Sequence, residues 1–347
     1  MRDTTVLRDG RAPATGLPIG RVLLLLSAGL VVSAAASIAI GAETVSPVRV
    51  LTALVSGRDS DPEAWTLVLH YRIPRTLVGI AVGAALGVAG GLIQAYTRNP
   101  LADPGILGVS AGAALAAILA IAAGWAFTTA SLVWPSIVGA LLATLAVLLL
   151  AATGHGPATP VRMTLAGVAL AAVLGGITTA ILLSDPDTFA RFRSWAAGSV
   201  AGRDVTDLVA VAPFVAVGLV LAIVLVRPLN AVAMGEDVAA SLGVDVRRVR
   251  LGTVAAVALL VGAATAVAGP IIFVGLMIPH AVRLLVGNDH TRIVPLSVLA
   301  APCLLLAADV LARVIIPMRE APVGLVTAFV GAPVLLWLIR NKQVNTQ

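Results

Sequence analysis

The spacing of the charged residues beside long apolar stretches indicates which of them could form ion pairs or bind a partner. Arg72 and Arg75 lie three residues apart, so a helix places them on one face, directly before an apolar run. Arg313 ends another apolar run, one helical turn after Asp309. An i,i+4 spacing allows an ion pair, and a carboxylate at membrane depth requires such a partner. We therefore expect Asp309 and Arg313 to form a structural ion pair. The alternative is a titrating Asp309 that relays protons.

Several kinds of chemistry lack the residues that they need. The sequence has one lysine, Lys342, near its C-terminal end, whereas a phosphate-binding P-loop places a lysine between a glycine-rich turn and a helix. The single cysteine, Cys303, excludes a disulfide framework. His155, His280 and His290 lack the spacing of metal ligands, and a metal site needs several ligands that converge. We therefore predict no metal, no cofactor and no catalytic residue on this chain.

The composition identifies the environment in which these residues act. The chain has 347 residues, of which 59% are hydrophobic and 12% are charged, and its mean hydropathy is +1.03. A soluble domain could not bury so much apolar surface, and the apolar runs are too long for the strands of a membrane β-barrel. The cations are spread between apolar runs, which argues against a nucleic-acid-binding groove. The sequence therefore predicts an all-α polytopic membrane protein.

The apolar runs predict about ten transmembrane helices, because a spanning helix needs roughly 20 residues. An even number of crossings puts both termini on one side, and the excess of arginine on that side indicates the cytoplasm. Residues 1–20 then form a cytoplasmic N-terminal tail, residues 21–340 the transmembrane domain, and residues 341–347 a cytoplasmic C-terminal tail. The predicted spans are 22–40, 76–95, 105–123, 132–152, 164–183, 208–226, 251–268, 270–287, 294–312 and 323–339.

Three segments between the spans are long enough to have a role of their own. Residues 41–75 and 184–207 are expected outside, and the second contains Phe192 and Trp195, which could belong to a short helix lying on the membrane. Residues 227–250 are expected inside, as short helices separated by glycines. Within the second span, small residues favour close helix packing at Gly83, Gly87, Gly90 and Gly91.

Motifs along nearly the whole chain resemble one family of membrane proteins. The first block runs from Arg72-Ile-Pro-Arg-Thr76 through Gly83 and Gln94 to the segment from Arg98 to Gly112, which begins Arg-Asn-Pro-Leu-Ala-Asp-Pro-Gly. A second block extends from Gly269 to Arg283 and continues into Gly287-Asn-Asp-His290, and a third joins Asp309 and Arg313 to Glu320-Ala-Pro-Val-Gly324 and Gly331-Ala-Pro333. These motifs resemble the FecCD family, the transmembrane subunits of ABC importers for iron-siderophores, haem and vitamin B12.

The resemblance implies a type II ABC importer permease architecture and assigns expected roles to particular residues. Arg72, Arg75 and Arg313 would dock acidic residues of a substrate-binding protein, and interfacial arginines are the simpler explanation of the same positions. The cytoplasmic segment 229–248 would be the coupling segment that contacts the ATPase, with contacts expected at Gly235, Glu236, Leu242 and Gly243. A cytoplasmic gate would include Thr159, Pro160 and Val161, although this loop is richer in proline than in relatives.

The implied function is transport by a permease subunit in the bacterial plasma (inner) membrane. The expected partners are a second permease subunit, identical or related, two ATPase subunits that hold ATP and Mg²⁺, an extracytoplasmic binding protein and the lipid bilayer, with no nucleic acid. An iron-siderophore is the expected cargo, with vitamin B12 or haem as alternatives. A proton-coupled secondary transporter that uses Asp309 is the alternative from another class, although proton relays usually need more buried ionisable residues than this sequence has.

Overall fold

A computed structural model describes residues 18–41, 46–58, 61–125, 129–153, 159–316 and 320–344, and within these ranges all regular secondary structure is helical. The helices are α1 (Ile19–Ala39), α2 (Pro47–Ser56), α3 (Pro62–Thr66), the π-helical η1 (Leu67–Arg72), α4 (Ile73–Thr97), the 3₁₀ turn η2 (Pro104–Leu107), α5 (Val109–Ala122), α6 (Thr129–Ala152), α7 (Pro160–Ser184), α8 (Pro186–Ala196), α9 (Val205–Ala233), α10 (Glu236–Ser241), α11 (Val246–Ala268), α12 (Val274–Val286), α13 (His290–Ile315) and α14 (Val323–Val344).

Each of the ten predicted apolar spans overlaps one of the longer helices, most of which extend beyond the predicted ends. Among the described residues, seven helices are long and apolar enough to cross a membrane, and three more apolar helices are shorter: α5, α12 and the part of α14 up to Leu336. The prediction of an all-helical, multi-pass membrane protein is therefore confirmed. The second span is longer than expected, because α3, η1 and α4 form one helical stretch of 36 residues.

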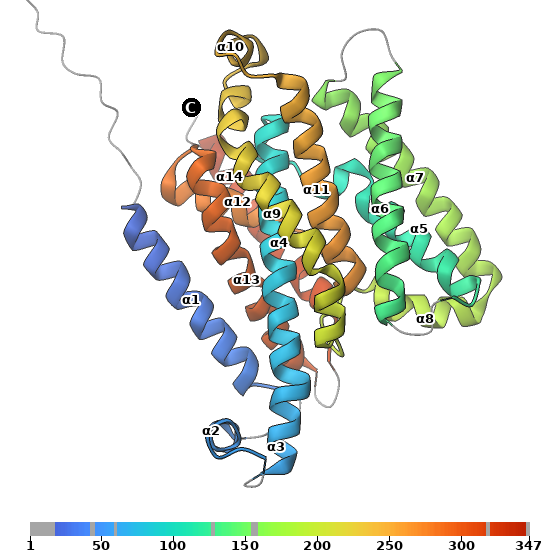
Figure 1. Ribbon diagram of the computed structural model, residues 1–347, viewed down its shortest axis with the longest axis vertical. Coiled ribbons are helices and arrows are strands. Elements are labelled where there is room, and N and C mark those ends of the chain that lie inside the picture. The colour runs from blue at the N-terminus through green and yellow to red at the C-terminus, as the bar shows by residue number, and fades with distance from the viewer. Residues whose placement is uncertain are drawn as a thin grey trace, which may run out of the picture.

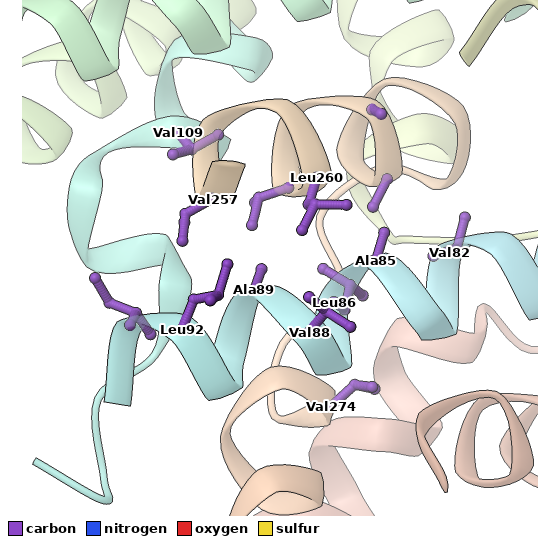
Figure 2. Close-up of a cluster of buried hydrophobic side chains, with 14 of the residues drawn as sticks. Val82, Ala85, Leu86, Val88, Ala89, Leu92, Val109, Val257, Leu260 and Val274 are labelled. Carbon is purple, nitrogen blue, oxygen red and sulfur yellow. The ribbon is translucent and has the colours of Figure 1, made fainter. Parts of the chain in front are cut away.

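The α4 helix is the centre of the bundle. It contacts α13, α11, α9 and α12, and Figure 1 shows it in the middle of the molecule, with α1 at one side and α5 to α8 grouped at the other. Figure 2 shows why it is buried: apolar side chains of α4, including Val82, Leu86 and Leu92, meet Leu260 of α11 and Val274 of α12. A helix that is apolar all round belongs inside a bundle.

The glycines of α4 are positions where neighbouring backbones approach closely, as the sequence predicts. A Cβ atom at Gly83 would lie 2.7 Å from the Cα atom of Pro302 in α13, and one at Gly90 would overlap the carbonyl oxygen of Gly275 in α12. Small residues let helices pack in this way where lipid offers no hydrophobic driving force. The glycines thus fix how α12 and α13 lie on α4.

The two ends of the bundle carry different short helices. Figure 1 shows α10 at one end and α2, α3 and α8 at the other, which agrees with the sequence assignment of α10 to the inside and of the other three to the outside. The α8 helix differs from its expected form in one respect. Phe192 and Trp195 are buried, and the Trp195 indole nitrogen donates to the Ala266 carbonyl at 3.3 Å. These aromatic residues therefore pack α8 against the protein.

Candidate functional site

The outer end of the bundle contains a buried cluster of charges around Asp309. Arg75 of α4 makes a two-pronged contact with this carboxylate, with Nη2 2.8 Å from Oδ1 and Nε 3.0 Å from Oδ2. Arg313, one turn further along α13, also pairs with Asp309. The Nη1 of Arg75 reaches Glu320 at 2.7 Å. The cluster joins α4, α13 and the segment before α14, so the expected pair of Asp309 and Arg313 lies within a larger network.

Arg313 of this cluster and Arg72, which precedes α4, hold the C-terminal end of α1. Arg72 Nη1 donates to the carbonyl oxygens of Ile38 and Ala39 at 2.9 and 2.8 Å. Arg313 Nη1 donates to those of Ser37 and Ile40 at 2.7 and 2.9 Å. The last carbonyls of a helix lack partners within it and carry partial negative charge, so cations stabilise them. This fixes α1 against α4 and α13.

Burial limits the hydrogen bonds that the three motif arginines, Arg72, Arg75 and Arg313, can donate to a partner. Arg72, Arg75 and Arg313 are only 4%, 9% and 3% exposed, and many of their donors are occupied by the contacts above. The interfacial explanation of these arginines is wrong for the described structure, because their charged ends lie inside the protein rather than in water. An acidic partner would meet a network that already contains the carboxylates of Asp309 and Glu320.

A further arginine, which sequence reasoning missed, lines the same region. A cavity of about 630 Å³ at the outer end is bordered by the three motif arginines, Glu63, Glu320 and Arg203 from the loop between α8 and α9. The Nε atom of Arg203 is buried and has no hydrogen-bond partner in the described structure. Burial lowers the pKa of Arg203, and the charge of Asp207 opposes this shift. Its place beside the cluster, about 130 residues away in sequence from Arg72 and Arg75, has no local sequence signal.

At the inner end, α10 has the glycine boundaries that the sequence predicts. Gly235 and Gly243, at φ 131° and 79°, adopt backbone conformations that favour glycine, and they turn the chain into and out of α10. Glu236 accepts a hydrogen bond from Arg250 Nη2 of α11 at 3.0 Å, which braces the short helix. Leu242, which directly follows α10, is 63% exposed. The segment thus presents an apolar side chain on a braced helix outside the bundle.

The expected gate residues lie at the start of α7, at the inner end. The Thr159 side chain caps the helix by accepting from the Arg162 backbone amide at 3.4 Å, and Pro160 occupies the first turn, where proline is tolerated. Val161 is exposed. Residues 154–158 of this loop, with His155, lie outside the described residues. The described part of the loop shows a capped helix start.

The other histidines do not gather with further metal-binding side chains. His280 is buried in α12, and His290 Nδ1 lies 2.8 Å from Asn230 Oδ1. Among the described residues, no group of three or more His, Cys, Asp or Glu side chains could hold a metal ion.

Comparison with known proteins gives one consistent result. The profile of the FecCD transport family matches residues 29–341. The ferric enterobactin transport system permease protein FepD of Escherichia coli is 46% identical over 320 residues, which cover 92% of this chain and 94% of that protein. The hemin transport system permease protein HmuU of Yersinia pestis is 36% identical, and the match covers 93% of this chain and 98% of that protein.

A solved structure gives the same answer for the fold. It is an inward-facing conformation of a metal-chelate type ABC transporter, and it is similar with a TM-score of 0.82 and 27% identity over 93% of this chain and 99% of that chain. The sequence motifs, the helical bundle and the matched relatives agree along almost the entire length. This chain therefore belongs to the FecCD transport family and is a multi-pass permease subunit of an ABC importer of the inner membrane.

Proposed function

We propose that this chain forms the translocation pathway for a ferric siderophore, as one half of a permease dimer. The observation that supports this cargo is the 46% identity, over nearly the full length of both chains, to a permease named for ferric enterobactin. Relatives named for hemin and cobalamin are 36% and 38% identical. Haem and vitamin B12 are therefore the alternative substrates to test.

The energy for transport comes from separate subunits in this proposal. Lys342 is the single lysine of the sequence and lies near the end of α14, without the glycine-rich turn of a P-loop. ATP and Mg²⁺ would bind to two partner ATPase subunits. The contact point would be the coupling segment 229–248, in which α10 presents Leu242 and is braced by the pair of Glu236 and Arg250.

An extracytoplasmic binding protein would deliver the cargo to the outer cavity. Arg72, Arg75 and Arg313 supply positive charge beneath this cavity, and Arg203 lines it with a guanidinium that lacks a hydrogen-bonded carboxylate in the described structure. Charge complementarity steers an acidic partner and fixes its register. Because the donors of the motif arginines are already largely engaged, Arg203 is the side chain best placed to pair with an incoming carboxylate.

The gate at Thr159, Pro160 and Val161 belongs to this proposal as the inner exit of the pathway. The proton-coupled alternative gains no support from the cluster. Both oxygens of Asp309 accept from arginine, so protonation of this carboxylate would break two buried ion pairs. The carboxylate is better explained as part of the framework that holds α1, α4 and α13.

Uptake in proteoliposomes tests the function. The chain is reconstituted with its ATPase and binding protein, and labelled ferric enterobactin, haem or cobalamin is supplied outside with ATP inside. We expect uptake of the ferric siderophore that requires both partners. Uptake of haem or cobalamin alone would contradict the cargo. Uptake without ATPase, lost in Asp309→Asn, would contradict the ABC mechanism.

A further inference from the structure

A second cavity, at the inner end of the bundle, has an unusual balance of charge. Its volume is about 670 Å³, and it lies where α4, α9 and α12 end and α13 begins. The charged and polar side chains that border it come from all four helices and their links: Gln94, Arg98, Asn230, Arg283, Asn288, Asp289 and His290. It is separate from the outer charge cluster, which lies at the other end of α4 and α13.

Arg283 brings an uncompensated charge to this cavity. Its Nη2 donates to the neutral side chain of Gln94 at 3.2 Å, while its Nη1 is buried without a hydrogen-bond partner in the described structure. Gln94 is itself held by α12, since its Nε2 donates to the Leu276 carbonyl at 3.0 Å. No described carboxylate forms an ion pair with Arg283 or with Arg98. A partly buried cation without a counter-ion is costly, so this arrangement favours an added anion.

The one acidic residue at the cavity is already engaged. Asp289 caps the start of α13 through the Thr291 amide at 2.9 Å, accepts from Asn230 Nδ2 at 2.8 Å and lies 3.4 Å from Arg292. These hydrogen bonds, and the charge of Arg292, hold the pKa of Asp289 below its usual value although burial opposes this. Asp289 therefore serves the helix terminus, and the cavity keeps its excess of positive charge.

Exposed apolar side chains follow the cavity along the coupling segment. Met234 borders the cavity and is 64% exposed. Val238 and Leu242, four and eight residues later, are 43% and 63% exposed. Figure 1 shows α10 beyond the ends of α9 and α11, at the end assigned to the cytoplasm. An apolar strip beside a charged pocket is the composition of a protein interface, with an apolar anchor and a polar contact that fixes register.

We propose that the inner cavity receives a carboxylate side chain of the ATPase subunit, which pairs with Arg283 and Arg98 while α10 makes the apolar contact. This inference rests on the proposed function, because it assumes an ATPase partner. The ion pair in the cavity is a second contact besides the apolar one, and it attaches the ATPase subunit to the ends of α4 and α12 as well as to α10. Movement of the ATPase would then act directly on α4, the central helix of the bundle.

The test measures the affinity of the ATPase subunit of this transporter for the chain in lipid nanodiscs. The variants are Arg98→Gln, at an exposed position, and Arg283→Gln, which keeps a hydrogen-bonding side chain beside Gln94. The matched control is Arg227→Gln, an exposed arginine near the end of α9 that does not border the cavity. We expect each cavity variant to weaken binding roughly tenfold or more, and the control to leave it unchanged. Elution volume and melting temperature verify that each variant is folded.

A double-mutant cycle identifies the partner group. Acidic residues of the ATPase are changed singly to their amides, and one of them should lose its effect in the Arg283→Gln background. Unchanged affinity in both arginine variants, while Leu242→Asp abolishes binding, would overturn the second contact and leave the proposed function standing. Arginine effects that occur only with anionic phospholipid, or that inorganic phosphate competes away, would assign the cavity to a phosphate group and also overturn it. Failure of the unmodified chain to bind the ATPase would contradict both proposals.

Discussion

Arg75 on α4 and Asp309 on α13 are separated by 234 residues in the sequence and form a two-pronged ion pair in the bundle, with Nη2 and Nε at 2.8 and 3.0 Å from the two carboxylate oxygens. Both side chains are buried, at 9% and 1% exposure. Arg313 shares the same carboxylate. Both arginines thus share Asp309, and Arg75 also pairs with Glu320. Because Asp309 joins the two arginines, the cluster depends on this residue.

Replacement of this carboxylate should destabilise the protein strongly. In Asp309→Asn, two buried guanidinium groups lose their shared counter-ion, and breaking a buried pair typically costs about 3–5 kcal/mol. We expect a clearly lower melting temperature of the purified chain in nanodiscs. The control is Arg248→Gln, which removes an ion pair whose arginine side chain is 88% exposed. Such a surface pair is worth about 1 kcal/mol or less, so equal losses in the two variants would refute the structural role of Asp309.

Replacement of Gly90, where α4 contacts α12 closely, should also destabilise the protein. Gly90→Ala places a methyl group on the Gly275 carbonyl oxygen, so α12 must move away from α4. We expect a loss of about 1–3 kcal/mol or more, measured as reduced thermal stability. Gly176→Ala, in α7, is the matched control because no atom lies within 4 Å of the added Cβ. There the alanine should be neutral or stabilising, since it is the better helix former. A Gly90→Ala variant as stable as this control would show that the helices are less closely packed.

The helices of this chain could be predicted from its sequence, and the charge network only in part. Ten apolar runs predicted ten helices because hydropathy is a local property, and the i,i+4 spacing predicted contact between Asp309 and Arg313 for the same reason. The contact of Arg75 with Asp309 joins distant segments, so local spacing could not show it. Burial of the motif arginines and the place of Arg203 beside them likewise depend on how α1, α4 and α13 pack. The excess charge of Arg283 is visible only once the other side chains around it are placed.

The coupling role of α10 predicts a selective loss of ATPase binding. Leu242 is exposed, so Leu242→Asp should leave the fold intact while it removes the apolar contact with the partner. We expect the affinity for the ATPase subunit to fall at least roughly tenfold, measured by binding to the nanodisc-embedded chain. Ser241→Ala changes the adjacent exposed position and should bind normally. Normal ATPase binding by Leu242→Asp would exclude α10 as the main point of contact.

The outer helices α2 and α3 should open only in strong acid. Hydrogen bonds from the Arg49 side chain and the Ala64 amide lower the pKa of Asp61 from its usual value. A carboxyl group whose pKa is lowered in the folded state stabilises the fold fully above its unfolded-state pKa, which is about 3.9. This contribution is lost as the pH falls through the folded-state pKa. Arg49→Gln should therefore shift the opening to higher pH. Hydrogen exchange of the α2 and α3 amides, corrected for the intrinsic pH dependence, measures the midpoint.

Glu63→Gln is the control for this titration. Glu63 lies 3.3 Å from Arg49 and its side chain is 81% exposed, whereas Asp61 lies 2.7 Å from the same arginine. The Glu63 variant should therefore leave the midpoint of opening almost unchanged. An equal shift in the two variants would mean that the general positive charge of Arg49, rather than its contact with Asp61, holds the segment.

Docking of the binding protein distinguishes Arg203 from the motif arginines. Arg203 lines the outer cavity without a hydrogen-bonded carboxylate in the described structure, so Arg203→Gln removes an available charge and disturbs no ion pair. We expect slower association of the binding protein and a weaker dependence of its rate on salt, because charge at an interface acts mainly on the encounter.

Arg75→Glu, in contrast, should lower stability before it affects docking, because it places a second carboxylate against Asp309. Arg193→Gln, an exposed position on α8, controls for general positive charge at this end. If the association rate is the same for Arg203→Gln and the unmodified chain, the incoming carboxylate must be received by the motif arginines, and the network around Asp309 would then have to rearrange during docking.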